Sequence, residues 1–87
     1  MVTIGGDPEQ LSVLKGTFDE QAANVQQLMA TLRGQLDGTQ WQGPSADRFR
    51  SAWSGDFEPA LRRLQDALVD AGVAIGAARD RQLQAGS

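Results

Sequence analysis

Apolar residues recur at helical spacing along both halves of this chain, and a short segment containing glycine and proline separates the halves. That segment is Trp41-Gln42-Gly43, followed at once by Pro44, close to the midpoint of the 87 residues. Steps of three and four residues keep one side of a helix apolar, whereas glycine and proline interrupt helices. The pattern therefore predicts an all-α chain in which a turn containing tryptophan joins two long helices.

The first half has a recognisable helix start and a wide apolar stripe. Asp7 can cap free backbone N–H groups, Pro8 suits a first helical turn, and Gly38 suits the C-terminal end. We expect a flexible N-terminus at 1–7 and a helix over 8–37. The apolar stripe of this helix contains Leu11, Leu14, Phe18, Val25 and Leu32. A single helix cannot bury a stripe of this width.

The second half continues the pattern over a longer stretch. With the turn at 38–43 and Pro44 in a first helical turn, we expect a second helix over 44–79. The polar residues 80–87 should fray. Two long helices joined by so short a connection should lie antiparallel, as a helix-turn-helix hairpin. The second apolar stripe contains Phe49, Trp53, Phe57, Leu61, Leu64, Leu68 and Ile75.

One segment of the second helix breaks the local rules. Gly55 weakens a helix, and Pro59 removes a hydrogen bond and clashes with the preceding turn. Two interpretations are open: a kink near 55–59, or a true break in which Asp56 caps a new helix. The unbroken apolar spacing from Phe49 through Leu61 favours the kink.

Composition argues against catalysis and against several ligands. The chain has no cysteine and no histidine, so the common metal ligands, a thiol nucleophile and an imidazole base are missing. Asp66 follows Arg62 by about one helical turn and Asp70 follows Arg63 by about two, a pattern typical of a solvated helix face. Without a glycine-rich phosphate loop either, the sequence predicts a protein that is not an enzyme, with no catalytic residues, no metal, no cofactor and no small-molecule substrate.

The charge balance and the hydropathy pattern bear on larger partners and on location. The formal net charge of −3 argues against nucleic acid and against an anionic membrane surface. No apolar stretch approaches the roughly 20 residues of a membrane span. Residues 1–10 show neither a basic segment nor an apolar run, so no Sec-type signal is expected there. These rules alone indicate a cytoplasmic protein, unless export uses another signal.

Trp41 allows two interpretations. It can be a hydrophobic plug at the end of the hairpin, with Gly43 needed only for its backbone conformation. Alternatively, its ring stays partly exposed and forms a recognition surface with the turn. Packing considerations alone favour the plug. Trp53, which begins a second Trp-x-Gly tripeptide, falls within the apolar stripe and is expected in the core.

The whole chain resembles the WxG-motif, ESAT-like family of type VII secretion substrates. The resemblance lies in Trp41, Gly43, Phe49 and Trp53, with the leucine-rich run Leu61, Leu64 and Leu68 behind them. It implies a hairpin that pairs with an identical or homologous hairpin into a four-helix bundle and leaves the cytoplasm by a Sec-independent route. It also implies a source such as actinobacteria or Firmicutes, an export ATPase as a further partner, and a role for Trp41 and Gly43 in export recognition.

The chain departs from the family pattern in having no tyrosine. Many exported members, or one partner of each pair, carry a Tyr-x-x-x-Asp/Glu signal after the second helix. Either this chain supplies the turn while a partner supplies the tail, which is the favoured interpretation, or it is not exported. Other functions stay open: an intracellular adaptor of the same fold, or a membrane-active effector, which the negative charge disfavours.

Overall fold

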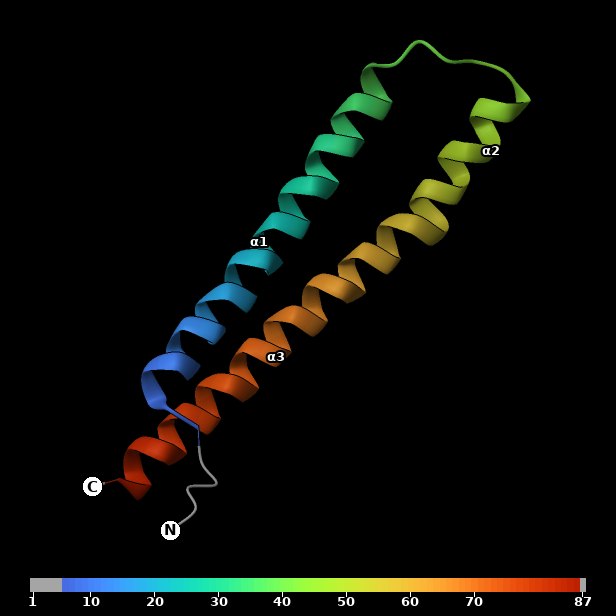
Figure 1. The fold of residues 1–87 in the computed structure, drawn as a ribbon. Coiled ribbons are helices and arrows are strands. Elements are labelled where there is room, and N and C mark those ends of the chain that lie inside the picture. The colour runs from blue at the N-terminus through green and yellow to red at the C-terminus, as the bar shows by residue number, and fades with distance from the viewer. Residues whose placement is uncertain (1–5, 87) are drawn as a thin grey trace.

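The protein is an extended helical hairpin. The computed structural model describes residues 6–86, and in these it has α1 (Pro8–Gly38), α2 (Pro44–Ala52), a π-helical turn η1 (Trp53–Phe57) and α3 (Glu58–Ala85). Figure 1 shows α1 running up one side and α2 and α3 returning antiparallel beside it. No strand occurs within this part of the chain. The predicted all-α helix-turn-helix hairpin is therefore confirmed.

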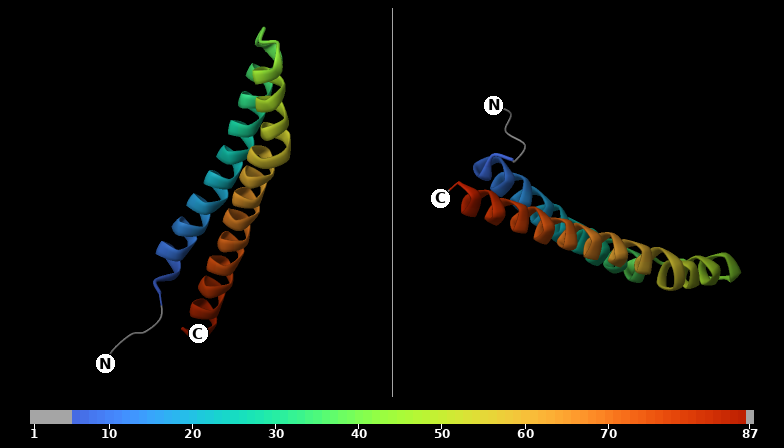
Figure 2. Two further views of the ribbon diagram at one scale, coloured as in Figure 1. Left: turned by 90° about the vertical axis from the view of Figure 1, so that its right-hand side faces the viewer. Right: turned by 90° about the horizontal axis from the view of Figure 1, so that it is seen from below.

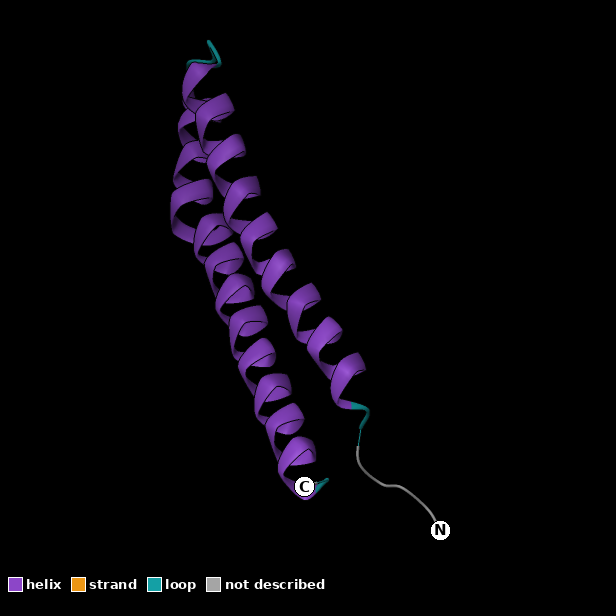
Figure 3. Ribbon diagram, turned by 90° about the vertical axis from the view of Figure 1, so that its left-hand side faces the viewer, coloured by secondary structure: helices purple, strands orange, loops and turns teal. Residues whose placement is uncertain are grey.

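The segments α2, η1 and α3 form one continuous rod (Figure 2), and helix runs unbroken through 53–57 (Figure 3). Pro59 has no N–H to donate, and its ring would crowd the carbonyl four residues earlier. The turn before it is widened instead: the Glu58 N–H donates to the Trp53 carbonyl, five residues back. Phe57 keeps helical backbone angles and no side chain caps α3. The alternative of a break with a new helix capped by Asp56 is therefore wrong.

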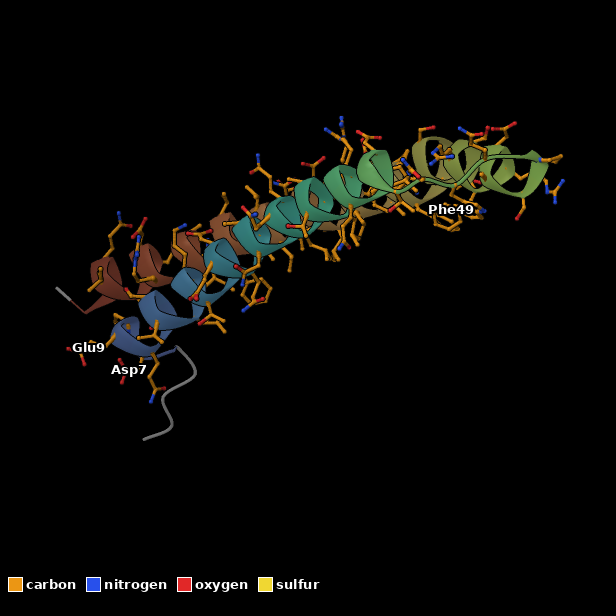
Figure 4. All side chains as sticks on the ribbon, turned by 90° about the horizontal axis from the view of Figure 1, so that it is seen from above. Asp7, Glu9 and Phe49 are labelled. Carbon is orange, nitrogen blue, oxygen red and sulfur yellow. The ribbon has the colours of Figure 1, made fainter. Side chains whose placement is uncertain are left out.

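The start of α1 is fixed by its cap. The Asp7 carboxylate, labelled with Glu9 in Figure 4, accepts the backbone N–H of Glu9 at 2.8 Å and that of Gln10 at 3.5 Å. Two of the free N–H groups of the first turn are thereby satisfied. Of the N-terminus expected to be flexible, residues 1–5 lie outside the described part of the chain.

The C-terminal helix is longer than the sequence predicted. α3 continues to Ala85, so the prediction that the helix ends at 79 and that 80–87 fray is wrong for the residues up to 85. Arginine, glutamine, leucine and alanine, which dominate this segment, are all good helix formers. Arg79 also reaches across to α1, where its Nη1 lies 3.5 Å from the Ser12 hydroxyl. Ser87 lies outside the described residues.

The hairpin buries little by itself. It measures 67 × 18 × 17 Å, with a radius of gyration of 19.4 Å, against about 12 Å for a compact domain of this length. Among the described residues, the only buried apolar side chains are Ala22, Met29 and Ala46, and no large side chain is fully buried. Gly72 and Gly76 of α3 are also buried, where that helix meets α1. The seam between the helices is narrow, and many large apolar side chains stay exposed on the single chain.

Candidate functional site

The turn end of the hairpin carries a row of aromatic rings. The ring centroids of Trp41 and Phe49 lie 5.6 Å apart, and those of Phe49 and Phe57 lie 6.2 Å apart, both pairs tilted by about 45°. These are favourable separations for aromatic pairs. Phe49, labelled in Figure 4, projects from α2 near the turn. Trp41 nevertheless stays 37% exposed, so it packs on the hairpin and still presents a surface.

Arg50 holds the turn in place. Its Nη1 donates to the Trp41 carbonyl at 2.7 Å and its Nη2 to the Thr39 carbonyl at 3.3 Å. The guanidinium carbon lies 6.0 Å from the centroid of the Trp41 ring, at the limit for cation–π attraction. The Thr39 hydroxyl donates to the Gln35 carbonyl at 2.6 Å. The indole thus packs against Phe49, and Arg50 fixes the backbone of the turn that carries it.

Gly43 has a backbone reason to be glycine. It precedes α2 with φ 109° and ψ 177°, a region that residues with a Cβ rarely occupy. No atom lies within 4 Å of where its Cβ would be, so space is not the constraint. Of the described residues, it alone has a positive φ. Together with Pro44 in the first turn of α2, Gly43 sets the direction in which the second rod leaves the turn.

We expect Gly43→Ala to destabilise the protein by about 1–3 kcal/mol, because alanine is strained at this φ and ψ. The matched control is Gly34→Ala, which lies inside α1 with nothing within 4 Å of its Cβ position. That change should stabilise by about 0.5–1 kcal/mol, because glycine disfavours helix interiors. Urea unfolding of both variants at one protein concentration, followed by circular dichroism, measures the difference. Equal effects of the two changes would contradict the backbone role of Gly43.

One side of the hairpin is apolar along its length. We call this side the apolar face. Leu32 of α1 lines a hollow with Phe49 and Trp53, and Phe57 contacts Phe49, so these residues share one side. Residues three, four or seven apart lie on the same side of a helix, so Leu28 and Leu14 extend this side along α1 and Leu64 extends it along α3. Its exposed members are Leu14, Leu28, Leu32, Phe49, Phe57 and Leu64.

The apolar residues proposed from the sequence divide between the seam and this face. The seam and its border hold, half-buried, Leu11, Phe18, Val25, Trp53, Leu61, Leu68 and Ile75. The other five proposed residues, Leu14, Leu32, Phe49, Phe57 and Leu64, are exposed on the apolar face. Trp41, Phe49 and Phe57 form a row that begins at the turn, whereas Leu11 lies in the first turn of α1 and Ile75 in the C-terminal half of α3, away from the turn.

The opposite side of the hairpin is charged. Arg33 of α1 donates two hydrogen bonds to the carboxylate of Glu58 in α3, from Nη2 to Oε1 at 2.6 Å and from Nε to Oε2 at 3.1 Å. Arg62 adds a third contact to Oε1 at 3.1 Å. The hydrogen bonds from Arg33 lower the pKa of the Glu58 carboxyl from its ordinary value. Partial burial opposes this shift, while the charges of both arginines and the indole of Trp53 assist it. The contacts tie α1 to the start of α3.

The sequence reasoning did not single out Arg50, Met29 or Ala46. Arg50 had one available signal: the last turn of α1 contains no basic residue, so its free carbonyls and those of the turn need a donor from elsewhere. Arg50 supplies that donor for Thr39 and Trp41. The burial of Met29 and Ala46 depends on how α1 is aligned against α2 and α3, and no local sequence pattern specifies that alignment.

The described residues offer little chemistry beyond these contacts. Within 6–86, no group of three or more acidic, histidine or cysteine side chains could hold a metal ion. Among the same residues, none of the helices has the length and apolar character needed to cross a membrane. What the arrangement provides is a fixed aromatic turn at one end of a long apolar face.

Comparison with known proteins agrees with this geometry. Residues 3–86 match a family model, WXG100, described as proteins of 100 residues with WXG. No curated protein and no solved structure matches the chain. Proteins of the matched family are small secreted or structural helical proteins rather than enzymes, and they commonly pair with homologous partners. Because the match covers nearly the whole chain, this protein belongs to the WXG100 family of small helical-hairpin proteins.

Proposed function

We propose that the chain is a substrate of a type VII secretion system, or the co-secreted partner of one. In this role the hairpin pairs through its apolar face with an identical or homologous hairpin to form a four-helix bundle. Trp41 and Gly43 form part of the signal that the export machinery, including its ATPase, recognises. The complex leaves the cytoplasm without a Sec signal, as expected for a family whose members are type VII secreted proteins.

The observation that carries this proposal is the state of Trp41. A plug would be buried and a free side chain would have no partners. Trp41 instead packs on Phe49, lies near the Arg50 guanidinium and is still 37% exposed. An aromatic ring that is held rigid before a partner arrives loses little conformational entropy on binding. Such preorganised aromatics are the usual anchors of protein recognition. An intracellular adaptor would need the same dimer but would have no use for this turn.

Export can be tested directly with the full chain. We expect the protein in the culture medium of a bacterium with an active type VII system and its absence from the medium of an otherwise identical strain lacking the export ATPase. A cytoplasmic protein measured in the same medium controls for lysis. A homologous hairpin should be co-produced in a parallel culture, because a partner can supply the missing tail signal. Equal amounts in the medium of both strains, or retention in every culture, would rule out the proposed function.

A further inference from the structure

The backbone of the turn makes few hydrogen bonds of its own. Residues 39–43 lie between α1 and α2, outside any helix. One backbone hydrogen bond lies at the start of the turn, from the Thr39 N–H at 3.3 Å, and one at its end, to the Gly43 carbonyl at 3.0 Å. Among the described residues, no backbone–backbone hydrogen bond involves positions 40–42. Segments without such bonds rearrange easily, so the part of the turn that carries Trp41 keeps one conformation only if a side chain fixes it.

Arg50 of α2 is the side chain that fixes this segment. Its Nη1 donates to the Trp41 carbonyl at 2.7 Å and its Nη2 to the Thr39 carbonyl at 3.3 Å. The guanidinium is planar and holds its N–H groups in a rigid fork, so the two carbonyls are fixed relative to each other as well as to α2. Within residues 6–86, no other side chain donates a hydrogen bond to a carbonyl of the turn.

The hydrogen bonds of Arg50 go to the turn alone. In the described part of the chain, the basic side chains that form ion pairs are Lys15, Arg33, Arg62 and Arg79. Arg50 is half-buried and makes no ion pair there, and both of its hydrogen bonds go to neutral carbonyls. Hydrogen bonds from a charged donor are stronger than those between neutral groups. Arg50 therefore restrains the turn and does not tie α1 to α3 as Arg33 does.

The fixed carbonyls determine where the indole begins. The carbonyl carbon and the Cβ of Trp41 are both attached to its Cα, so a fixed carbonyl restricts the direction of the side chain. From there the ring packs on Phe49, with centroids 5.6 Å apart, and stays 37% exposed. Phe49 restrains the ring from one side only, so loss of the backbone contacts would let the indole sample further positions. A mobile ring loses more conformational entropy when a partner binds it.

We infer that Arg50 is the positioning residue of the turn: through the Trp41 and Thr39 carbonyls, its guanidinium holds the indole in the orientation in which the export machinery binds it. The inference rests on the proposed function and adds to the signal a residue outside the Trp-x-Gly tripeptide. Arg50 acts through the backbone of the turn and does not have to touch the partner. Lysine can replace it only in part, because an ammonium group is a point charge on a flexible stem and lacks the planar fork.

The first measurement follows the mobility of the Trp41 ring in the purified full chain. The chain has two tryptophans, so Trp53→Phe leaves the fluorescence anisotropy decay to report Trp41 alone. In that background, Arg50→Gln should increase the amplitude of the fast local motion by about twofold or more. Arg48→Gln is the matched control, because it removes the same charge from an exposed position of α2. It should leave that amplitude unchanged.

The second measurement is export of the chain with both tryptophans, as the ratio of protein in the medium to protein in the cells. Arg50→Gln should lower this ratio by about fivefold or more, as expected when a preorganised contact is lost, and Arg50→Lys should lower it less. Arg48→Gln should keep more than half the wild-type ratio. Arg33→Gln should do the same: it removes an ion pair between α1 and α3, so it controls for stability lost away from the turn.

Helix content of the purified variants covers the case of misfolding: if Arg50→Gln loses helix, Arg50→Lys is compared with the controls in its place. A looser ring and reduced export, with both controls near wild type, support the inference. An unchanged ring overturns it, as does a looser ring with unchanged export. Equal loss of export in Arg33→Gln overturns it too, because stability alone would then account for the effect. A wild-type chain that is never exported overturns the proposed function instead, and the ring measurement still decides whether Arg50 positions Trp41.

Discussion

Replacing Trp41 with alanine should reduce export of the chain at least tenfold while leaving its pairing intact. The side chain lies at the tip of the hairpin, and the ring and cation contacts it makes are with Phe49 and Arg50. Loss of the Trp41 ring removes the exposed surface that, in our proposal, the export machinery recognises. The apolar face extends along the whole hairpin, so removing one ring at its end should weaken the dimer only slightly. The measurement is the ratio of protein in the medium to protein in the cells.

Phe57→Ala is the matched control for this experiment. Phe57 is the last ring of the same row and is 48% exposed, but it lies on the rod rather than in the turn. Its replacement should weaken pairing more than Trp41→Ala does and should leave export at more than half the wild-type level. Unchanged export of Trp41→Ala would remove the turn from the signal. Loss of the dimer together with export would make Trp41 a packing residue only.

The hairpin could be predicted from the sequence because two periodic patterns and one interruption specify it. Leucine and phenylalanine at steps of three and four, separated by Gly43 and Pro44, allow few arrangements other than two antiparallel helices. The turn residues were also identifiable, because Trp41 and Gly43 stand where the periodicity stops. Neither interpretation of Trp41 was complete, since the ring both packs and remains partly exposed.

The sequence could not predict which apolar side chains are buried, because burial depends on how α1 is aligned against the helices of the second half. Leu61 and Leu64 are equivalent in a helical pattern, yet Leu61 is half-buried and Leu64 is exposed. The difference is set by which side of α3 meets α1. Pro59 signalled a disturbance, but the π-helical turn at Trp53–Phe57 that accommodates it depends on a compromise between the lost hydrogen bond and continuous packing on both sides. α3 extends to Ala85 because residues 80–85 include good helix formers, although their polar composition suggested fraying.

The close approach of α1 and α3 leads to the second large expected effect. A Cβ at Gly72 would lie 2.6 Å from the Asp19 carboxylate and 3.7 Å from the Phe18 Cβ. Asp19 is not free to swing away without cost, because Lys15 donates to its other oxygen at 2.8 Å. Gly72→Leu places a whole isobutyl group in this contact. It should therefore push the helices apart and destabilise the protein by roughly 2–3 kcal/mol, as overpacked cores do.

The same substitution elsewhere separates this clash from the intrinsic effect of leucine. Gly34 lies in the interior of α1 with nothing within 4 Å of its Cβ position, so Gly34→Leu should stabilise by about 0.5–1 kcal/mol through helix propensity alone. Urea unfolding at one fixed concentration gives both values. A loss of stability in Gly72→Leu together with a gain in Gly34→Leu would show that α1 and α3 approach each other closely at Gly72. The small residue at this position would then keep the two helices side by side and the apolar face continuous. A higher free energy of unfolding for Gly72→Leu would mean that the helices are far enough apart to accommodate the leucine side chain. A groove would then separate the α1 and α3 parts of the apolar face at this point.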